Sequence, residues 1–386
     1  MKVDFFNLTE QYEQVRENIT SKIQKIFDTQ RFILGENVFN FEESFAKYCG
    51  AKYSIAVSSG TDALLVSLMS LGITAGDEVI LPDFTFFATA GVVARLGAKP
   101  VFVDVDKDTF LIDCNAIAKA ITSKTKAIIP VHIFGQCADI DAIKEIAGNI
   151  PIIEDSAQSV GAEYKNSLKA GTLGMMGCFS FYPTKNLGGA GDSGAITTND
   201  EAIYNKILQM RNHGMEPKYY HSFVGGNFRM DEIQAAVLLA KLPYIDQWNN
   251  LRRINYSLYR KYFIECGLKT EVRCDMLSNE NNVILPLSIY ENSGVVNFHT
   301  FHQYCILANR RDELKKFLFD NEIGTDIYYP VPLHRQQCFS NYNYDDADFP
   351  NTNYICNNIL ALPIYSELHE SEIMYVVDVI GKFYKR

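Results

Sequence analysis

The stretch EVILPDFTFFATAGVVARLGAKPVFVDV, residues 78–105, decides the fold. It begins with the apolar run Glu78–Leu81 and ends with the apolar run Pro100–Val105, each of a length that suits a buried strand. Residues 89–96 between them carry a helical pattern. Parallel strands need a long connection, usually a helix, to return to the same edge of a sheet. The stretch therefore predicts a strand–helix–strand unit within a parallel sheet.

The same alternation extends on both sides of this stretch, from about residue 50 to about residue 200. Further strand candidates are Ala127–Val131, Ile152–Asp155, Cys178–Phe181 and Gly194–Thr197. Further helix candidates are Asp62–Leu71, Cys114–Ile121 and Asp139–Ile146. We therefore expect an α/β fold in which a mainly parallel sheet is sandwiched by helices.

The length of 386 residues suits two domains. Residues 1–250 are expected to form a helical N-terminal arm of about 40 residues and then the large α/β domain. A helical stretch at Met230–Trp248 leads out of this domain. Residues 251–386 are expected to form a smaller C-terminal α+β domain that ends in a helix near Ser371–Tyr384.

Composition excludes several functional classes. Hydrophobic residues make up 47% of the chain, which is enough for a buried core and too many for a disordered protein. The net charge of −10 and the scattered Lys and Arg residues argue against nucleic acid or an anionic membrane surface as a partner. No apolar run is long enough for a membrane helix, and no secretory segment follows Met1–Asp4.

The nine cysteines are never closer than eight residues, and the seven histidines show no His-x-x-x-His spacing. We therefore expect reduced thiols, a cytoplasmic location and no metal site.

Lys185 and Asp155 are the residues that carry the most information about chemistry. Asp155 ends the apolar run Pro151–Asp155, and Lys185 follows thirty residues later in the run Ser180–Leu187. A lysine can form an imine with an aldehyde, and a carboxylate at a strand end can keep a pyridine nitrogen protonated. These are the two groups that pyridoxal phosphate requires from an enzyme.

Two small-residue segments bear on phosphate binding. Ser58–Ala63 lies between an apolar segment and a helix, where free N–H groups and small side chains suit a phosphate, although an ordinary helix cap is the alternative interpretation. Ser180 offers a second phosphate donor near Lys185. The run Gly189–Gly194 matches Gly-x-Gly-x-x-Gly, but a strand pattern follows it instead of a helix, so we reject a dinucleotide site there.

Two further residues allow alternative roles. Phe86 follows a strand and can stack on a flat heterocycle, but with 25 phenylalanines in the chain core packing is the default interpretation. Asn227 can cap the helix that follows it or donate to an anion.

Taken in order, these segments resemble the DegT/DnrJ/EryC1/StrS family of pyridoxal-phosphate-dependent nucleotide-sugar aminotransferases, which have fold type I. The matching segments are Phe32–Gly35, Val57–Leu64, Pro82–Thr89, Gly135–Asp141, Glu154–Gln158, Ser180–Leu187, Arg211–Gly214, Gly226–Ala236 and Tyr329–Gln336. They span nearly the whole chain, and the ordered set is specific although each segment alone is not.

The resemblance implies a role for each matching residue. Lys185 would form the imine with pyridoxal phosphate and then move the proton, and Asp155 would pair with the pyridine nitrogen. The other cofactor contacts would be Gly60, Thr61 and Ser180 at the phosphate, Phe86 on the ring, Gln158 at the ring hydroxyl, and Asn227 from the other subunit of a homodimer. Substrate contacts would be Tyr182, His221, Arg229, Tyr329 and His334.

The resemblance also implies a ping-pong reaction. Glutamate would leave pyridoxamine phosphate, which would aminate a keto group of a nucleotide-linked sugar for amino-sugar or lipopolysaccharide biosynthesis. The runs Lys218–His221 and Gly226–Asp231 are more similar to family members that aminate C3 than to those that aminate C4. C3 members often have His before the Tyr-Pro step, where this chain has Tyr328, so the sugar and its nucleotide, UDP or dTDP, stay open.

Two alternatives remain. One is a C4-keto substrate. The other is a regulatory protein that binds pyridoxal phosphate with little turnover, against which the presence of Lys185, Asp155 and Gln158 argues.

Overall fold

The computed structural model describes the whole chain except residues 166, 269, 272–276, 278–281 and 386. At its centre, the strand groups β3-β2-β4 and β5-β6-β7-β1 meet through the parallel bridges Ile128–Ile152 and Val131–Asp155. The strands are β1 (Tyr53–Val57), β2 (Glu78–Pro82), β3 (Lys99–Val103), β4 (Thr125–Ile128), β5 (Ile153–Asp155), β6 (Met176–Ser180) and β7 (Gly194–Thr198). Among these seven described strands, the antiparallel pairs are those that include β7, so the expectation of a mainly parallel sheet is confirmed.

Helices cover both faces of this sheet because successive side chains of a strand point in opposite directions. In β2, Val79 and Leu81 pack in one core with residues of α3 and α4, whereas Ile80 packs in another with residues of α5 and α6. The helices of this part are α2 (Glu36–Cys49), α3 (Gly60–Ser70), α4 (Ala88–Arg95), α5 (Cys114–Ala120), α6 (Ile140–Ala147), α7 (Glu201–Met210) and α8 (Glu232–Lys241). The sheet is therefore sandwiched by helices, as expected from the sequence.

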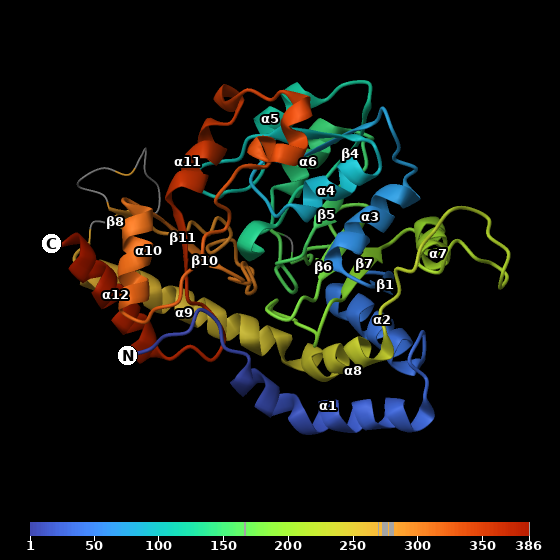
Figure 1. The fold of residues 1–386 in the computed structure, drawn as a ribbon, viewed down its shortest axis with the longest axis horizontal. Coiled ribbons are helices and arrows are strands. Elements are labelled where there is room, and N and C mark those ends of the chain that lie inside the picture. Colours follow the sequence, from blue (N-terminus) through green and yellow to red (C-terminus); the bar gives the residue numbers. More distant parts are fainter. Residues whose placement is uncertain (166, 269, 272–276, 278–281, 386) are drawn as a thin grey trace.

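The N-terminal arm contains α1 (Thr9–Thr29), which lies along α8 at the margin of the molecule (Figure 1). Val15 and Ile19 of α1 pack against Val237 and Ala240 of α8. The following helix, α2, was not expected from the sequence. Its first N–H groups donate to the carboxylate of Glu232, which lies nearly 200 residues away in the chain.

The C-terminal part is built on a second sheet in the order β11-β10-β9-β8. Its elements are α9 (Ile245–Glu265), β8 (Thr270–Glu271), β9 (Val283–Ile284), β10 (Tyr304–Ala308), α10 (Arg311–Asp320), α11 (Pro350–Asn358), β11 (Ile359–Leu362) and α12 (Glu370–Tyr384). Residues of α9, α10 and α12 share its core. Both chain termini lie on this side of the molecule (Figure 1).

The expected domain boundary at residue 250 falls inside α9, which continues unbroken from the large sheet to the small one (Figure 1). Part of the C-terminal half also returns to the large sheet, because Phe339 and Phe349 pack in the core that holds Val79 and Leu81. The division of the chain into 1–250 and 251–386 therefore stays a prediction.

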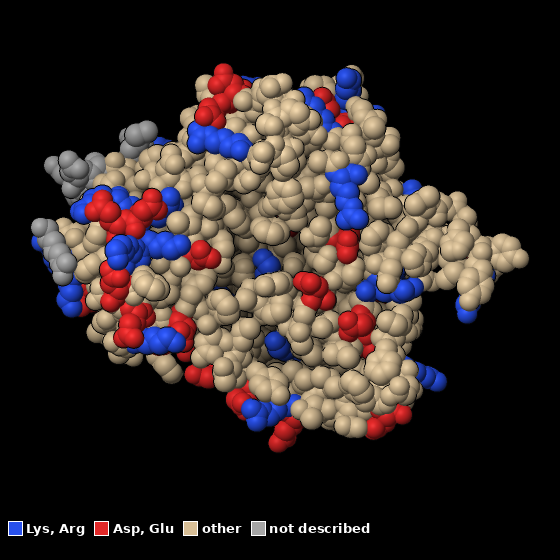
Figure 2. Space-filling model, viewed as in Figure 1, with Lys and Arg blue, Asp and Glu red and all other residues tan. Residues whose placement is uncertain are grey.

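The described residues bear on three features that the sequence did not predict: a membrane helix, disulfide bonds and a metal site. No described helix combines the length and apolarity that a membrane crossing requires. Eight cysteines are free thiols, and Cys274 lies outside the described residues. His, Cys, Asp and Glu side chains form no cluster of three suited to a metal among these residues. Acidic and basic side chains are interspersed on the face shown in Figure 2.

Candidate active site

A cavity of about 670 Å³ opens beside the carboxyl ends of β1, β2, β5 and β6. This edge is where ligands bind in open α/β sheets. Figure 2 shows a hollow near the centre of the molecule. The residues predicted from the sequence that line the cavity are Gly60, Thr61, Phe86, Asp155, Gln158, Ser180, Tyr182, Lys185 and Tyr329.

Lys185 enters the cavity from the loop after β6, where its backbone N–H donates to the carbonyl of Tyr182 at 2.8 Å. Burial lowers the pKa of Lys185 to about 8, although the charge of Asp155 opposes this shift. A lysine with such a pKa is partly neutral near pH 7 and so can act as a nucleophile. The side-chain nitrogen lies 3.5 Å from Nε2 of His302.

Asp155 is the last residue of β5 and is buried at the wall of the cavity. Oδ2 accepts a hydrogen bond from the hydroxyl of Thr89 at 2.9 Å, and Oδ1 accepts one from the N–H of Ala157 at 3.2 Å. Burial raises the pKa of Asp155, and these donors together with the charge of Lys185 act in the opposite direction. A cation bound beside this carboxylate would favour its ionised form.

The first turn of α3 lines another part of the cavity. Ser59 caps the helix by accepting from the N–H of Asp62 at 3.0 Å, while Gly60 and Thr61 line the cavity. A Cβ atom at Gly60 would lie 2.6 Å from Cβ of Ser180, so only glycine allows this close approach. Because first-turn N–H groups have no partner within a helix, the helix cap and the phosphate cradle are compatible here.

Phe86 and Tyr329 provide aromatic surface. The side chain of Phe86 is 57% exposed, which rules out core packing, and its ring centroid lies 6.2 Å from that of Tyr329. Gln158 accepts from the N–H of Phe134 at 2.5 Å through Oε1. Its Nε2 is therefore directed toward the hydroxyl of Tyr329, at 3.5 Å. The side-chain amide of Gln158 is therefore held with its NH2 group toward Tyr329.

Three predicted residues do not line the cavity of their own chain: His221, Asn227 and Arg229. They belong to the segment between α7 and α8, part of which projects away from the body of the molecule (Figure 1). Asn227 is exposed and does not cap α8, because Asp231 does so. Arg229 donates to Oδ1 of Asn212 at 2.6 Å, and its Nε is buried without a hydrogen-bond partner among the described residues.

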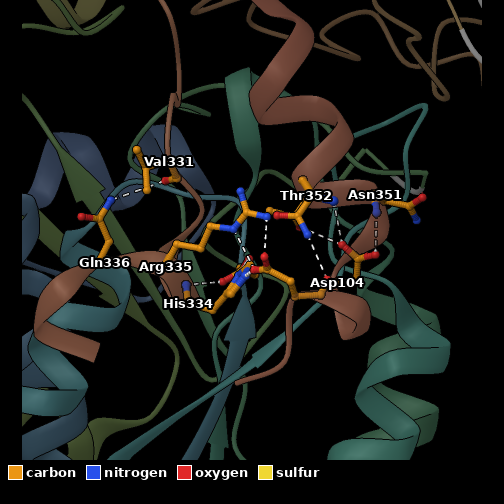
Figure 3. Close-up of polar contacts among 10 residues, drawn as sticks. Asp104, Val331, His334, Arg335, Gln336, Asn351 and Thr352 are labelled. Atoms are coloured by element: carbon orange, nitrogen blue, oxygen red, sulfur yellow. Dashed lines mark hydrogen bonds and ion pairs between the residues drawn. The ribbon is translucent and has the colours of Figure 1, made fainter. Parts of the chain in front are cut away.

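His334 also lies outside the residues that line the cavity. Its Nδ1 bonds to Asp83 at 2.6 Å and its Nε2 to Asp346 at 2.7 Å, so both ring nitrogens are engaged within the protein (Figure 3). His334 therefore links parts of the chain to each other, and the substrate contact expected for it stays a prediction. Through its bond to Asp83, His334 joins the segment after Tyr329 to the end of β2. Asp104 binds the N–H groups of Asn351 and Thr352 nearby in a similar way.

Sequence reasoning missed two side chains at the site. Thr89 positions Asp155 from the first turn of α4, and His302 contacts Lys185 from the segment before β10. Thr89 lay inside a segment that matched the family, so its hydroxyl could have been noticed. His302 comes 117 residues after Lys185, and no local pattern connects the two.

Comparison with known proteins places this site in a family. The sequence model of the DegT/DnrJ/EryC1/StrS aminotransferase family matches residues 13–381. The chain belongs to this family. It is 37% identical, over 98% of its length and 97% of the relative, to a UDP-N-acetyl-3-dehydro-alpha-D-glucosamine 3-aminotransferase of Acidithiobacillus ferrooxidans. It is 43% identical, over 100% and 99%, to a protein of Geobacillus stearothermophilus named pleiotropic regulatory protein.

Among solved structures, S. venezuelae DesV in complex with a ketimine intermediate matches with a TM-score of 0.91 and 34% identity, covering 100% of this chain and 99% of DesV. As a member of the DegT/DnrJ/EryC1/StrS family, the protein is an aminotransferase that uses pyridoxal phosphate. The residues that line its cavity suit this cofactor. They offer an imine-forming lysine, a buried carboxylate, an exposed aromatic ring and a helix N-terminus at which glycine is required.

Proposed function

We propose that the protein transfers an amino group from glutamate to a keto group at C3 of a nucleotide-linked sugar, in a ping-pong cycle. One observation carries this proposal: Lys185, Asp155 and Gln158 line a single cavity in a chain of the DegT/DnrJ/EryC1/StrS family. The relative from Acidithiobacillus ferrooxidans, whose name specifies a 3-dehydro sugar, supports C3 over C4.

When bound, pyridoxal phosphate supplies a reactive carbonyl and an electron sink. The residues of the chain do the rest. Lys185 Nζ, with a pKa of about 8, can attack a carbonyl and can also hold or release a proton near neutral pH. The carboxylate of Asp155 would stabilise positive charge at the pyridine nitrogen, and the first turn of α3 with Ser180 would hold the phosphate.

A second candidate function is supported by the relative from Geobacillus stearothermophilus, whose name describes a regulatory protein. In that case the protein would bind pyridoxal phosphate and turn over little. The lowered pKa of Lys185 favours the enzyme, because a cofactor that only served as a ligand would not require a lysine amine poised to lose its proton.

Two experiments separate these functions. In the first, the purified protein with pyridoxal phosphate is mixed with glutamate, and the cofactor absorbance is followed. The enzyme converts the cofactor to pyridoxamine phosphate, whereas a binding protein leaves the spectrum unchanged. In the second, UDP- and dTDP-linked 3-keto and 4-keto sugars, generated in situ, are offered to the pyridoxamine form. A mass increase that corresponds to amination of only the 4-keto sugars would reject C3.

We also propose that the active site is completed by a second copy of the chain in a homodimer. Asn227 and Arg229 lie outside the cavity of their own chain, in the segment that joins α7 to α8. Two-fold symmetry would bring each such segment to the other cavity and give two equal sites. Asn227 would then reach the phosphate of the cofactor in the partner subunit.

A further inference from the structure

His302 is a buried histidine that touches the proposed imine-forming lysine but has no part in the mechanism given above. Its Nε2 lies 3.5 Å from Nζ of Lys185, and its Nδ1 lies 3.1 Å from Oδ1 of Asn186. One imidazole therefore bridges two successive side chains of the loop after β6. This inference rests on the proposed role of Lys185.

We propose that His302 is a positioning residue for Lys185: its unprotonated Nε2 accepts a hydrogen bond from the lysine amine and holds that amine in place whenever it is not bound to the cofactor. In a transaminase the lysine is released and recaptured in each half-reaction, and a released side chain with four rotatable bonds needs an anchor.

The neighbouring amides determine which ring nitrogen of His302 carries the proton. Asn186 Nδ2 donates to Oδ1 of Asn249 at 2.7 Å and to the carbonyl of Thr300 at 3.0 Å. Asn249 is oriented in turn, because its own Nδ2 donates to the carbonyl of Val160 at 2.9 Å. The amide oxygen of Asn186 must then face His302, which places the proton on Nδ1 and leaves a lone pair on Nε2.

The charges around His302 keep the ring neutral. Burial lowers its pKa well below the ordinary value, and the positive charges of Lys185 and Arg252 act in the same direction. Asp155 is the charged group that acts on Lys185. A neutral ring with its lone pair toward the lysine accepts a hydrogen bond and does not repel the ammonium form.

The backbone of His302 is also fixed. Its N–H donates to the carbonyl of Phe134 at 2.9 Å, and its carbonyl accepts from Arg252 at 3.4 Å. The neighbouring Thr300 bonds the carbonyl of Gln158 at 2.7 Å. The ring therefore has little freedom to move away from Lys185, and the contact belongs to the framework of the site.

Two substitutions distinguish the contact of His302 with Lys185 from its contact with Asn186. In His302→Gln the amide reaches the position of Nε2 and can still accept from Lys185. In His302→Asn the amide reaches only the position of Nδ1, so it keeps the bond to Asn186 and loses the lysine. The two variants are equally polar and differ by one methylene, so a general loss of stability would affect both.

The first measurement uses the apoenzyme. The rate at which trinitrobenzene sulfonate modifies Lys185, located by peptide mass spectrometry, is measured against pH. We expect the apparent pKa of Lys185 to fall by roughly half to one pH unit in His302→Asn, because a hydrogen bond to the charged form is lost, and to stay near that of the wild type in His302→Gln. The second measurement is the rate of the glutamate half-reaction, which should fall roughly 10- to 100-fold in His302→Asn and only a few-fold in His302→Gln.

A His302→Asn variant that matches the wild type in both measurements overturns the proposal. Lys185→Ala, tested in parallel, shows which inference has failed. If Lys185→Ala retains turnover, the role of Lys185 is wrong and that of His302 falls with it. If Lys185→Ala is inactive while His302→Asn behaves as the wild type, only the role of His302 is wrong.

Discussion

Burial shifts the pKa values of Lys185 and Asp155 in opposite directions. Burial lowers the pKa of the lysine to about 8 and raises the pKa of the aspartate, because a less polar environment disfavours the charged form of each. Each group also favours the charged form of the other. At neutral pH this leaves a lysine that can give up its proton and a carboxylate whose ionisation a bound cation reinforces.

Replacement of Lys185 by alanine should abolish transamination and the absorbance of the lysine-bound cofactor while the fold is kept. Lys165 and Lys169 lie on another segment and should not replace it. Turnover and absorbance spectra measure the effect, and Lys185→Arg serves as a control that keeps the charge without an imine-forming amine. Near wild-type turnover in either variant would remove Lys185 from this role.

The capture of pyridoxal phosphate by the apoenzyme should depend on pH in a defined way. Below a pKa of about 8 the amine is protonated, so the capture rate should rise about tenfold per pH unit and level off above that value. Stopped-flow absorbance measures the rate. A profile that continues to rise toward pH 10 would show an unperturbed lysine.

Asp155→Asn should retain part of the cofactor affinity but lose several orders of magnitude in the rate of the glutamate half-reaction. The amide cannot keep the pyridine nitrogen protonated, so the charge that develops during proton removal is no longer stabilised. Single-turnover absorbance measures the rate, and equilibrium titration measures the affinity. Unimpaired kinetics would contradict the role of Asp155.

Helices and strands were largely predictable because hydrophobic periodicity is a local property. The strand expected at Glu78–Leu81 is β2 (Glu78–Pro82), and the helix expected at Thr89–Leu96 is α4 (Ala88–Arg95). Helix α2 was missed although its buried residues Val38, Phe41, Phe45 and Cys49 have helical spacing, so the sequence did carry a signal for it. His302 and the contacts of His334 carried no such signal, since only the folded chain brings their partners together.

Replacement of His334 should weaken the link between the segment after Tyr329 and the end of β2, and so destabilise the fold. Burial alone would lower the pKa of His334, but its bonds to Asp83 and Asp346 outweigh this and raise it. His334→Ala would leave the buried carboxylate of Asp83 without its ring partner, at a cost of about 3 kcal/mol in the free energy of unfolding. Denaturant titration of the apoenzyme measures this cost.

The neighbouring Arg335 is the matched control for His334. It also pairs with Asp346, but on the exposed side, so Arg335→Ala should leave the unfolding midpoint close to that of the wild type (Figure 3). Because the folded-state pKa of His334 is raised, its stabilising effect is fully present below about pH 6.5 and is lost as the pH rises through that pKa. Equal effects of the two substitutions at pH 6 would contradict the role given to His334.

At the scale of the whole molecule, the described chain holds the proposed catalytic residues in one cavity and keeps Asn227 outside it. The fold and the family follow from one chain, whereas the proposed shared site would be complete only in a dimer. If two subunits share their sites, two inactive variants can together form an active dimer.

Lys185→Ala and Asn227→Asp should each be nearly inactive, the second because a carboxylate repels the phosphate of the cofactor. Co-refolding the two variants should restore roughly a quarter of wild-type activity, since about half of the dimers are mixed and each mixed dimer has one intact site. Activity of the refolded mixture measures this recovery. No recovery is expected if Asn227 serves its own subunit, because each chain then carries a lesion in its own site.

Helix α9 determines where the chain tolerates a change in length. Asn249 orients Asn186 near the start of this helix, and Arg252, one turn later, holds the carbonyl of His302. A single residue inserted between them would turn one relative to the other by about 100°. Insertions and deletions in related proteins should therefore avoid residues 249–252 and occur in loops, because this helical turn keeps the lysine loop and the histidine segment in register.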